Sequence, residues 1–235
     1  MPTALITGAS KGIGKEAARL FATSGWDLLL VARSEDLLES LALDLTKTGQ
    51  RVFYQSIDFA DQEAIPSGLK ELLGKGLSPK VLINNAGVAW TGGLLSMPLK
   101  DWQWILQLNL TSVFQVCRAV VPSMRTNGGL VINVSSHASR NAFPQWGAYC
   151  ATKAALASFT KCLAEEERQH SIRACTLTLG SVNTTLWDTE TVQGDFNRAS
   201  MLSVEKVAEA LFSLATQSPN QVVEDLTLMP ATGAF

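Results

Sequence analysis

The feature that most limits how this chain can fold is a regular alternation of short apolar runs with longer helical patterns. The apolar runs predict strands, which are expected at Thr3–Thr7, Asp27–Ala32, Arg51–Ile57, Lys80–Asn84, Gly129–Ser135, Ile172–Leu179 and Val223–Leu228. Helical periodicity lies between them, at Gly12–Ser24, Ser34–Thr48, Gln62–Leu73, Asp101–Arg125, Ala148–His170 and Val204–Thr216. The runs LLLV and LVINV are continuous rather than alternating, as in parallel strands buried on both faces. The alternation therefore predicts an α/β fold with a doubly wound parallel seven-stranded sheet and helices on both faces.

The length of 235 residues suits one large α/β domain better than two, so residues 1–235 are predicted to form a single domain. Residues 181–203 follow a predicted strand and largely lack periodicity, which makes them a candidate substrate-loop region. The helices at Asp101–Arg125 and Ala148–His170 are apolar around more of their circumference than a solvent-facing helix needs. They predict that the chain forms a homo-oligomer.

Charge and composition exclude several classes of protein. The net charge is −2 with both signs interspersed, so no basic face is expected for nucleic acid or for an anionic membrane. No apolar run is expected to cross a bilayer, which takes about 20 residues, and no leader pattern opens the chain, so a cytoplasmic location is predicted. The four cysteines lie far apart in apolar surroundings and only two histidines are present, so no metal site is predicted.

A glycine-rich turn joins the first predicted strand to the first helix, in the order Thr7-Gly8-Ala9-Ser10-Lys11-Gly12-Ile13-Gly14. Gly8 permits a tight turn, and Gly12 and Gly14 let the backbone approach a pyrophosphate closely. The helix N-terminus then supplies free N–H groups and a partial positive charge. A glycine trio alone is weak support, but its position between a strand and a helix favours a Rossmann-type dinucleotide site over a turn without a ligand.

The end of the second strand favours NADPH or NADP over NAD. An acidic residue about 20 residues beyond the glycines would bind the adenosine ribose of NAD. The sequence instead places Arg33 and Ser34 there, and a guanidinium with a hydroxyl can bind a 2′-phosphate. Lys11 offers a second cation on the same side. The alternative is that Arg33 is a solvated residue after a strand.

Three residues form a candidate catalytic group: Ser136, Tyr149 and Lys153. Tyr149 and Lys153 are four residues apart in a helical pattern and therefore share one face. A phenol with an ordinary pKa near ~10 is a poor proton donor or base at neutral pH, so a neighbouring ammonium is expected to lower the pKa of Tyr149. Ser136 follows a strand at its carboxyl end, where its hydroxyl could bind a carbonyl oxygen.

Together these motifs resemble the short-chain dehydrogenase/reductase family from Ala4 to about Thr184. The glycine motif is followed by Asp58 after the third strand, by N-N-A-G at Asn84–Gly87 and by Asn109 in a helix. Ser136 and the Y-x-x-x-K pair of Tyr149 and Lys153 then occur at the spacing usual in the family.

The resemblance implies further roles for individual residues. It predicts that Asp58 and Phe59 contact the adenine, and that Asn85, Ala86 and Gly87 pass close to the adenosine ribose. It predicts that Lys153 also holds the nicotinamide ribose and that Asn109 anchors a water in a proton relay; for Asn109, a polar residue bending a buried helix is the alternative. Gly180, Val182 and Thr184 match the segment that binds the nicotinamide carboxamide. Leu179 replaces the usual proline there, so this loop is expected to be looser.

The predicted reaction is reduction of a ketone or aldehyde by hydride transfer from NADPH, with Tyr149 as the proton donor. Trp90, His137, Trp146 and Trp187 lie near the catalytic strand ends and suggest an apolar site for a small-molecule carbonyl substrate. Each could equally be ordinary packing. Alcohol oxidation by the same fold and a catalytically idle NADP-binding sensor or scaffold remain as alternatives.

Overall fold

Seven parallel strands form one sheet in the computed structural model, which describes residues 1–233. The strands are β1 (Thr3–Thr7), β2 (Asp27–Ala32), β3 (Val52–Ser56), β4 (Val81–Asn84), β5 (Gly129–Ser136), β6 (Ile172–Leu179) and β7 (Asp225–Leu228). Their order across the sheet is β3-β2-β1-β4-β5-β6-β7, and every neighbouring pair is parallel. The order reverses direction between β1 and β4, as in a doubly wound sheet. The predicted fold class is therefore confirmed.

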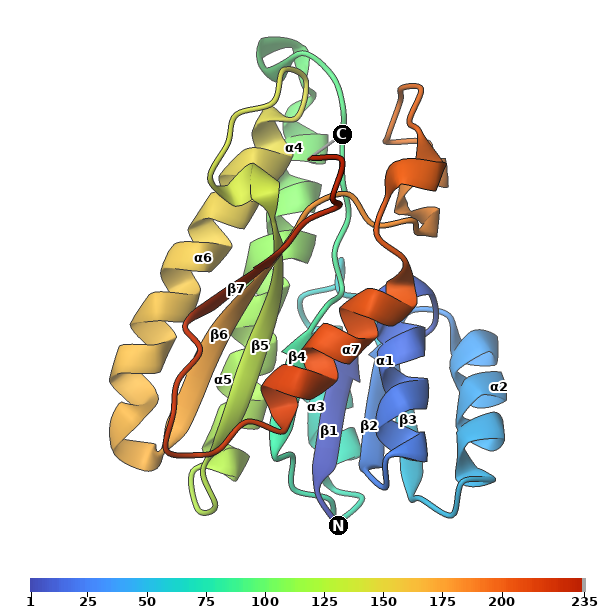
Figure 1. Ribbon diagram of the computed structural model, residues 1–235, viewed down its shortest axis with the longest axis vertical. Coiled ribbons are helices and arrows are strands. Elements are labelled where there is room, and N and C mark those ends of the chain that lie inside the picture. The colour runs from blue at the N-terminus through green and yellow to red at the C-terminus, as the bar shows by residue number, and fades with distance from the viewer. Residues whose placement is uncertain (234–235) are drawn as a thin grey trace.

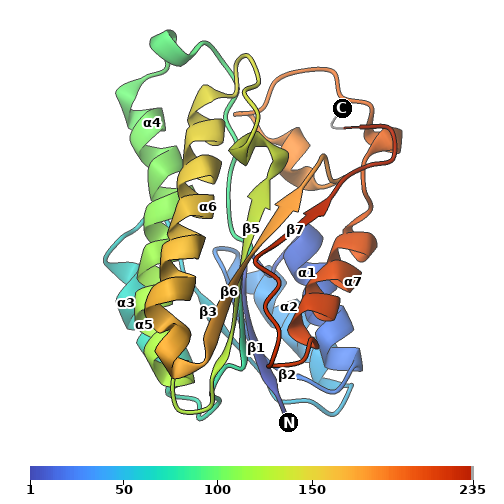
Figure 2. The ribbon, with the colours of Figure 1, turned by 60° about the vertical axis from the view of Figure 1, so that its left-hand side comes forward.

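Helices cover both faces of this sheet. They are α1 (Gly12–Thr23), α2 (Glu35–Thr46), α3 (Ala64–Leu73), α4 (Leu99–Leu106), α5 (Ser112–Met124), α6 (Gly147–Glu167) and α7 (Val204–Ala215). Helices α1, α2 and α7 lie on one face, and α3, α5 and α6 lie on the other (Figures 1 and 2). The carboxyl ends of the strands meet at one edge, and the loops that leave them carry the predicted site residues.

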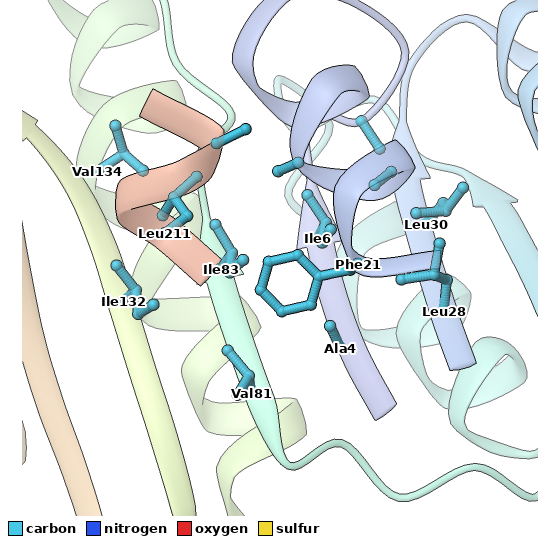
Figure 3. Packing of buried hydrophobic residues seen from close by; sticks show 14 of the residues in the cluster. Ala4, Ile6, Phe21, Leu28, Leu30, Val81, Ile83, Ile132, Val134 and Leu211 are labelled. Carbon is cyan, nitrogen blue, oxygen red and sulfur yellow. The ribbon is translucent and has the colours of Figure 1, made fainter. Parts of the chain in front are cut away.

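The two core layers follow from the pleat of the strands. Successive residues of a strand point to opposite faces, so Ala4 and Ile6 join one cluster while Leu5 joins the other. In the first cluster, Phe21 of α1 lies over the strands with Leu211 of α7 nearby (Figure 3). All of β1 and β2 is buried, which explains why their sequences read as continuous apolar runs.

The helix predicted over Asp101–Arg125 has an interruption that its periodicity did not reveal. It consists of α4, a π-helical turn over Gln107–Thr111 and α5, which continues past Pro122. The wider turn brings Gln107 and Asn109 to buried positions, where their amides find partners in other segments. The π-helical turn thus appears where two polar residues must face the interior.

Two predicted boundaries shift for local reasons. The helix predicted from Gln62 begins at Ala64, because the carboxylate of Asp61 accepts hydrogen bonds from the N–H groups of Glu63 and Ala64. The last strand, predicted from Val223, forms only over Asp225–Leu228. The other strands and helices lie within three residues of their predicted ends.

The combined helical run from Leu99 to Met124 is long and apolar enough to span a membrane, by length and composition alone. This differs from the sequence prediction that no run reaches that length. Half of its most apolar window is buried inside the fold, and a core helix of a globular domain passes the same test. The run packs against α3 and α6 on the sheet, so its apolar character serves the second core cluster.

Candidate active site

The glycine-rich turn between β1 and α1 adopts conformations that require glycine. Gly8 has φ +65° and Gly12 has φ +52°, both in the left-handed region. A Cβ on Gly14 would lie 2.3 Å from the carbonyl oxygen of Gly8, so this glycine allows the helix to sit against the turn. Among the described residues no side chain caps the start of α1, and the N–H groups of its first turn remain available for an anion.

Thr7 and Asn85 join this turn to the end of β4. The Thr7 hydroxyl accepts hydrogen bonds from the N–H groups of Asn85 (3.0 Å) and Ala86 (3.1 Å). The Asn85 amide donates back to the carbonyl oxygens of Thr7 (3.0 Å) and Gly8 (3.3 Å). These four bonds hold two segments, distant in sequence, as one wall of a cleft.

A long cleft runs over the carboxyl ends of β1, β2, β3 and β4. It contains most of the residues predicted to bind a dinucleotide, namely Gly8, Ser10, Lys11, Gly12, Ile13, Arg33, Ser34, Asp58, Phe59, Asn85, Ala86, Gly87 and Thr184. The adjoining catalytic cavity shares Ile13, Asn85, Gly87 and Thr184 with the cleft and adds Gly180 and Val182. The two spaces share lining residues and therefore adjoin each other.

The far end of the cleft presents two cations. Lys11 and Arg33 are both exposed and line it, and neither has an ion-pair partner within residues 1–233. The carbonyl oxygen of Arg33 accepts a hydrogen bond from the hydroxyl of Ser56 (2.9 Å), which fixes the main chain and leaves the guanidinium free. This arrangement suits a phosphate on the adenosine ribose.

Asp58 and Phe59, which the resemblance predicts to contact the adenine, also contact other parts of the chain. The Asp58 carboxylate accepts a hydrogen bond from the N–H of Ala60 (2.9 Å), so it caps the turn after β3. The Phe59 side chain is buried in the second core cluster, and its carbonyl oxygen accepts a bond from the amide of Gln107 (2.9 Å). Trp104, which the sequence prediction did not include, lines the same part of the cleft.

Ser136, Tyr149 and Lys153 meet in the catalytic cavity. Ser136 ends β5, and Tyr149 and Lys153 lie one helical turn apart near the start of α6. The Ser136 hydroxyl accepts a hydrogen bond from the N–H of Ala138 (3.2 Å) and lies close enough to the Tyr149 phenol to influence its pKa. The Lys153 ammonium lies 5.7 Å from the centre of the Tyr149 ring and donates a hydrogen bond to the carbonyl oxygen of Val134 (2.9 Å).

The pKa of Tyr149 differs in direction from the sequence prediction. Burial raises the pKa of Tyr149 to about 12, although the neighbouring Ser136 side chain opposes this change. Burial also lowers the pKa of Lys153 to about 8. Lys153 is not among the groups that change the pKa of Tyr149, and desolvation of the phenolate is the largest cause. Tyr149 therefore holds its proton throughout the physiological range.

Asn109 lies beside this group and positions the main chain. Its Oδ1 accepts a hydrogen bond from the N–H of Val88 (2.8 Å), and its Nδ2 donates to the carbonyl oxygen of Val88 (2.9 Å) and to the hydroxyl of Thr152 (3.1 Å). A Cβ on Gly87 would lie 3.2 Å from Asn109 Oδ1 and 3.7 Å from Lys153 Nζ. Both amide hydrogens are in use, so the side chain of Asn109 fixes the wall next to Lys153; the water relay stays a prediction.

The segment around Leu179 is held by strand pairing and by contacts to Leu202, and the expectation that the loop after it is looser than usual stays a prediction. Leu179 is the last residue of β6 and pairs with Ser136 on one side and Leu228 on the other. Unlike proline, leucine keeps the N–H that strand pairing uses, so the strand continues through this position. Beyond it, Ser181 and Asn183 hydrogen-bond to the main chain of Leu202 at 3.0 and 2.8 Å.

The predicted substrate residues also gather at the cavity. His137, Trp146 and Trp187 line it, whereas Trp90 does not. The ring of Trp146 lies 5.6 Å from that of Tyr149 and 5.7 Å from that of Trp187. Ser181 and Leu186, which belong to the predicted substrate-loop region, also line the cavity, and so does Phe143, which was not predicted from the sequence.

Comparison with known proteins identifies the class. Residues 2–194 match the family described as short chain dehydrogenase. An NADP-dependent 3-hydroxy acid dehydrogenase of Schizosaccharomyces pombe is 31% identical over 239 residues, which cover 97% of this chain and 92% of that protein. A serine 3-dehydrogenase of Agrobacterium fabrum is 28% identical, with 99% and 95% of the two chains covered.

Solved structures agree with this result. An alcohol dehydrogenase from the archaeon Thermococcus sibiricus, complexed with 5-hydroxy-NADP, has a TM-score of 0.91 and 30% identity, with 98% of this chain and 97% of that chain covered. L-Sorbose reductase from Gluconobacter frateurii, complexed with NADPH and L-sorbose, has a TM-score of 0.89 and 27% identity, with 99% and 96% covered. This chain belongs to the short-chain dehydrogenase family of oxidoreductases.

Two residues that support the site were missed by sequence reasoning. Thr7 was treated only as part of the glycine motif, and Thr152, next to Lys153, was not considered. Each acts through a hydroxyl that holds a segment from elsewhere in the chain: Thr7 holds the end of β4, and Thr152 holds Asn109. A polar residue at the end of a buried strand was an available signal for Thr7, but none marked Thr152.

Proposed function

We propose that this chain is an NADPH-dependent carbonyl reductase that converts a ketone or aldehyde to an alcohol. The observation that carries the proposal is the meeting of Ser136, Tyr149 and Lys153 in one cavity, at the point where that cavity adjoins the dinucleotide cleft. The cofactor is NADP(H), because Lys11 and Arg33 offer unpaired cations at the far end of the cleft. When bound, NADPH supplies the hydride.

The residues of the chain provide the remaining chemistry. Ser136 and Tyr149 bind the carbonyl oxygen and polarise the carbonyl as negative charge develops on that oxygen. Tyr149 then donates its proton to the oxygen, which yields the alcohol. Its raised pKa keeps it in the protonated form that a donor needs. Lys153 stabilises the phenolate that remains, and Asn109 keeps the Gly87–Val88 wall in place beside it.

The reductase should be tested by initial-rate oxidation of NADPH, with NADH in parallel, across ketones, aldehydes, quinones and β-ketoacyl thioesters. We expect turnover with NADPH preferred. Tight NADPH binding without turnover of any carbonyl would favour the alternative of a catalytically idle sensor or scaffold. Oxidation of alcohols faster than reduction at equal saturation would favour a dehydrogenase.

The dependence of kcat/KM on pH should reveal the titration of the Lys153 side chain. Its pKa is lowered to about 8, so the side chain is charged below that pH and neutral above it. Because the ammonium stabilises the developing phenolate, kcat/KM for reduction is expected to be constant at lower pH and to fall above about pH 8. Tyr149 stays protonated over this range and adds no second step.

A Lys153→Arg variant provides the control for this profile. A guanidinium keeps its charge, with a pKa above ~12, so any residual activity of the variant should lack the fall at high pH. A wild-type profile that stays flat well above the pKa of Lys153 would contradict the assignment.

The assembly, location and domain organisation predicted from the sequence belong to this proposal. We propose that the chain works as one unit over residues 1–235, that residues 181–203 form its substrate loop, and that it acts in the cytoplasm as a homodimer or homotetramer. Phe114 on α5, half exposed, offers an apolar contact for such an interface. Residues 234 and 235 lie outside the described part of the chain.

A further inference from the structure

The catalytic cavity offers almost no charge to a substrate. Among the described residues that line it, Lys153 is the one lysine, arginine, aspartate or glutamate, and its Nζ donates to the carbonyl oxygen of Val134 at 2.9 Å. The His137 imidazole is engaged with a neighbour, because its Nε2 lies 2.8 Å from Nδ2 of Asn141. An anionic group in this cavity would find no lysine or arginine on the described lining besides Lys153, which lies beside Tyr149.

The arginines nearest to the cavity are already paired with carboxylates. Arg140, which follows the Ser136–Ser139 turn, lies 2.6 Å from the carboxylate of Asp225. Arg198 lies 2.8 Å from the carboxylate of Asp188 and also donates to Asn183 and Thr184. A carboxylate that enters without a partner loses its hydration without compensation, which lowers its affinity for the cavity.

One side of the cavity is an aromatic wall formed by Trp146 and Trp187. Their ring centres are 5.7 Å apart, and Trp187 lies 4.5 Å from the ring of Phe196 behind it. The indole N–H of Trp187 donates to the carbonyl oxygen of Val182 at 2.7 Å. With that polar group satisfied, Trp187 presents apolar ring surface, and an aromatic or alicyclic ring can pack against it.

The segment that carries Trp187 is held over the cleft by specific bonds. The Thr191 hydroxyl donates to the carbonyl oxygen of Ala89 (2.7 Å), and the Thr91 N–H donates to the carbonyl oxygen of Thr191 (2.8 Å). The bonds of Arg198 to Asn183 and Thr184 tie the other end of the segment. The aromatic wall is therefore in place before a ligand arrives, which lowers the entropic cost of binding.

The edge of the cavity is apolar too. Leu94 and Leu95 are exposed, and a Cβ on Gly147 would lie 2.9 Å from Leu94, which places Leu94 against the start of α6, next to Trp146 in sequence. Exposed apolar surface next to a ligand cavity is typical of a site for apolar ligands.

We propose that the substrate is an uncharged ketone or aldehyde that carries a ring, with the ring against Trp146 and Trp187 and the carbonyl oxygen at Ser136 and Tyr149. This inference rests on the proposed reductase function and narrows its substrate class. It separates this chain from the relative named for 3-hydroxy acids, because the described lining of the cavity has no lysine or arginine for a carboxylate besides Lys153, which the proposed mechanism assigns to Tyr149. Trp146 is then a specificity-determining residue.

The test uses two ketones that differ in charge and share a ring, methyl 4-acetylbenzoate and 4-acetylbenzoate. We expect kcat/KM with NADPH to be at least about tenfold higher for the neutral ester, since one unmatched polar contact costs about that factor or more. In parallel, binding of each compound to the full chain with NADP⁺ present is followed by quenching of tryptophan fluorescence. This second measurement does not depend on turnover.

Substitutions of Trp146 test whether the aromatic wall binds the ring of the substrate. In Trp146→Ala the KM and the Kd for the ester are expected to rise about tenfold through loss of ring packing, and Trp146→Phe should restore most of the affinity. Trp102→Ala is the matched control, because Trp102 on α4 lines neither the cavity nor the dinucleotide cleft. NADPH affinity, measured for each variant, reports whether the fold is intact.

The outcomes separate the two proposals. Equal binding of the charged and neutral ketones, or unchanged affinity in Trp146→Ala, would overturn the substrate class even if the enzyme reduces other carbonyls. Selective binding of the ester that depends on Trp146, without NADPH oxidation by any carbonyl, would support the ring-binding site and contradict the reductase function instead.

Discussion

Replacement of Tyr149 by phenylalanine is expected to lower kcat for carbonyl reduction by about 10²- to 10⁴-fold, the usual contribution of a positioned proton donor. The variant keeps the ring that packs 5.6 Å from Trp146, so the cavity should keep its shape. It loses the hydroxyl that carries the proton and shares the cavity with Ser136. NADPH affinity should change little, because the phenol lines the catalytic cavity rather than the phosphate end of the cleft.

Tyr54→Phe is the matched control, since the chain has only two tyrosines and Tyr54 lies on β3, away from both clefts. We expect it to keep wild-type turnover. Single-turnover measurement of NADPH oxidation with the best ketone would separate slow chemistry from slow release. If Tyr149→Phe kept most of its turnover in that assay, Tyr149 would not be the proton donor.

Replacement of Arg33 by aspartate is expected to change the ratio of kcat/KM for NADPH and NADH by about 100-fold in favour of NADH. A charge-assisted bond to a phosphate contributes roughly 1.5–3 kcal/mol, and the new carboxylate adds repulsion of the same phosphate. An aspartate at the end of the second strand can also bind the two ribose hydroxyls of NADH. The exposed Arg33 side chain has no ion-pair partner within residues 1–233, so its loss should leave stability nearly unchanged.

Lys47→Asp changes the net charge by the same amount at the opposite end of α2 and is the control for long-range electrostatics. It should leave the cofactor ratio unaltered, since Lys47 lies outside the cleft. Titration of each protein with both cofactors, followed by nicotinamide fluorescence, gives the Kd values directly. An unchanged preference in Arg33→Asp would show that the 2′-phosphate is bound elsewhere, with Lys11 as the first residue to examine.

Much of the fold was predictable because its determinants are local. Continuous apolar runs in β1 and β2 correspond to strands that are entirely buried, and helical periodicity correctly located all the main helices. The glycine turn was also predictable, since Gly8 and Gly12 adopt the left-handed conformations that few other residues tolerate. The four-residue spacing of Tyr149 and Lys153 placed them on one helix face without any tertiary information.

The features that sequence reasoning missed or predicted wrongly are set by contacts between segments that lie far apart in the sequence. The π-helical turn around Asn109 depends on Val88, which lies 21 residues away in sequence, and no period in the helix itself indicates it. The pKa of Tyr149 rises because packing removes water from the phenol, an effect that an i, i+4 spacing does not reveal. Leu179 extends β6 because β5 and β7 flank it on both sides.

By itself the sequence determined the order of strands and helices, the glycine turn and the residue types that can donate a proton and bind a 2′-phosphate. These features depend on backbone conformation and on spacing within a few residues, which the sequence contains directly. Only the tertiary structure decided which groups are already partnered: Asn109 with Val88, Arg198 with Asp188, and Trp187 with Val182. Free and satisfied groups look alike in a sequence, because a hydrogen bond or an ion pair depends on distances between segments that folding brings together.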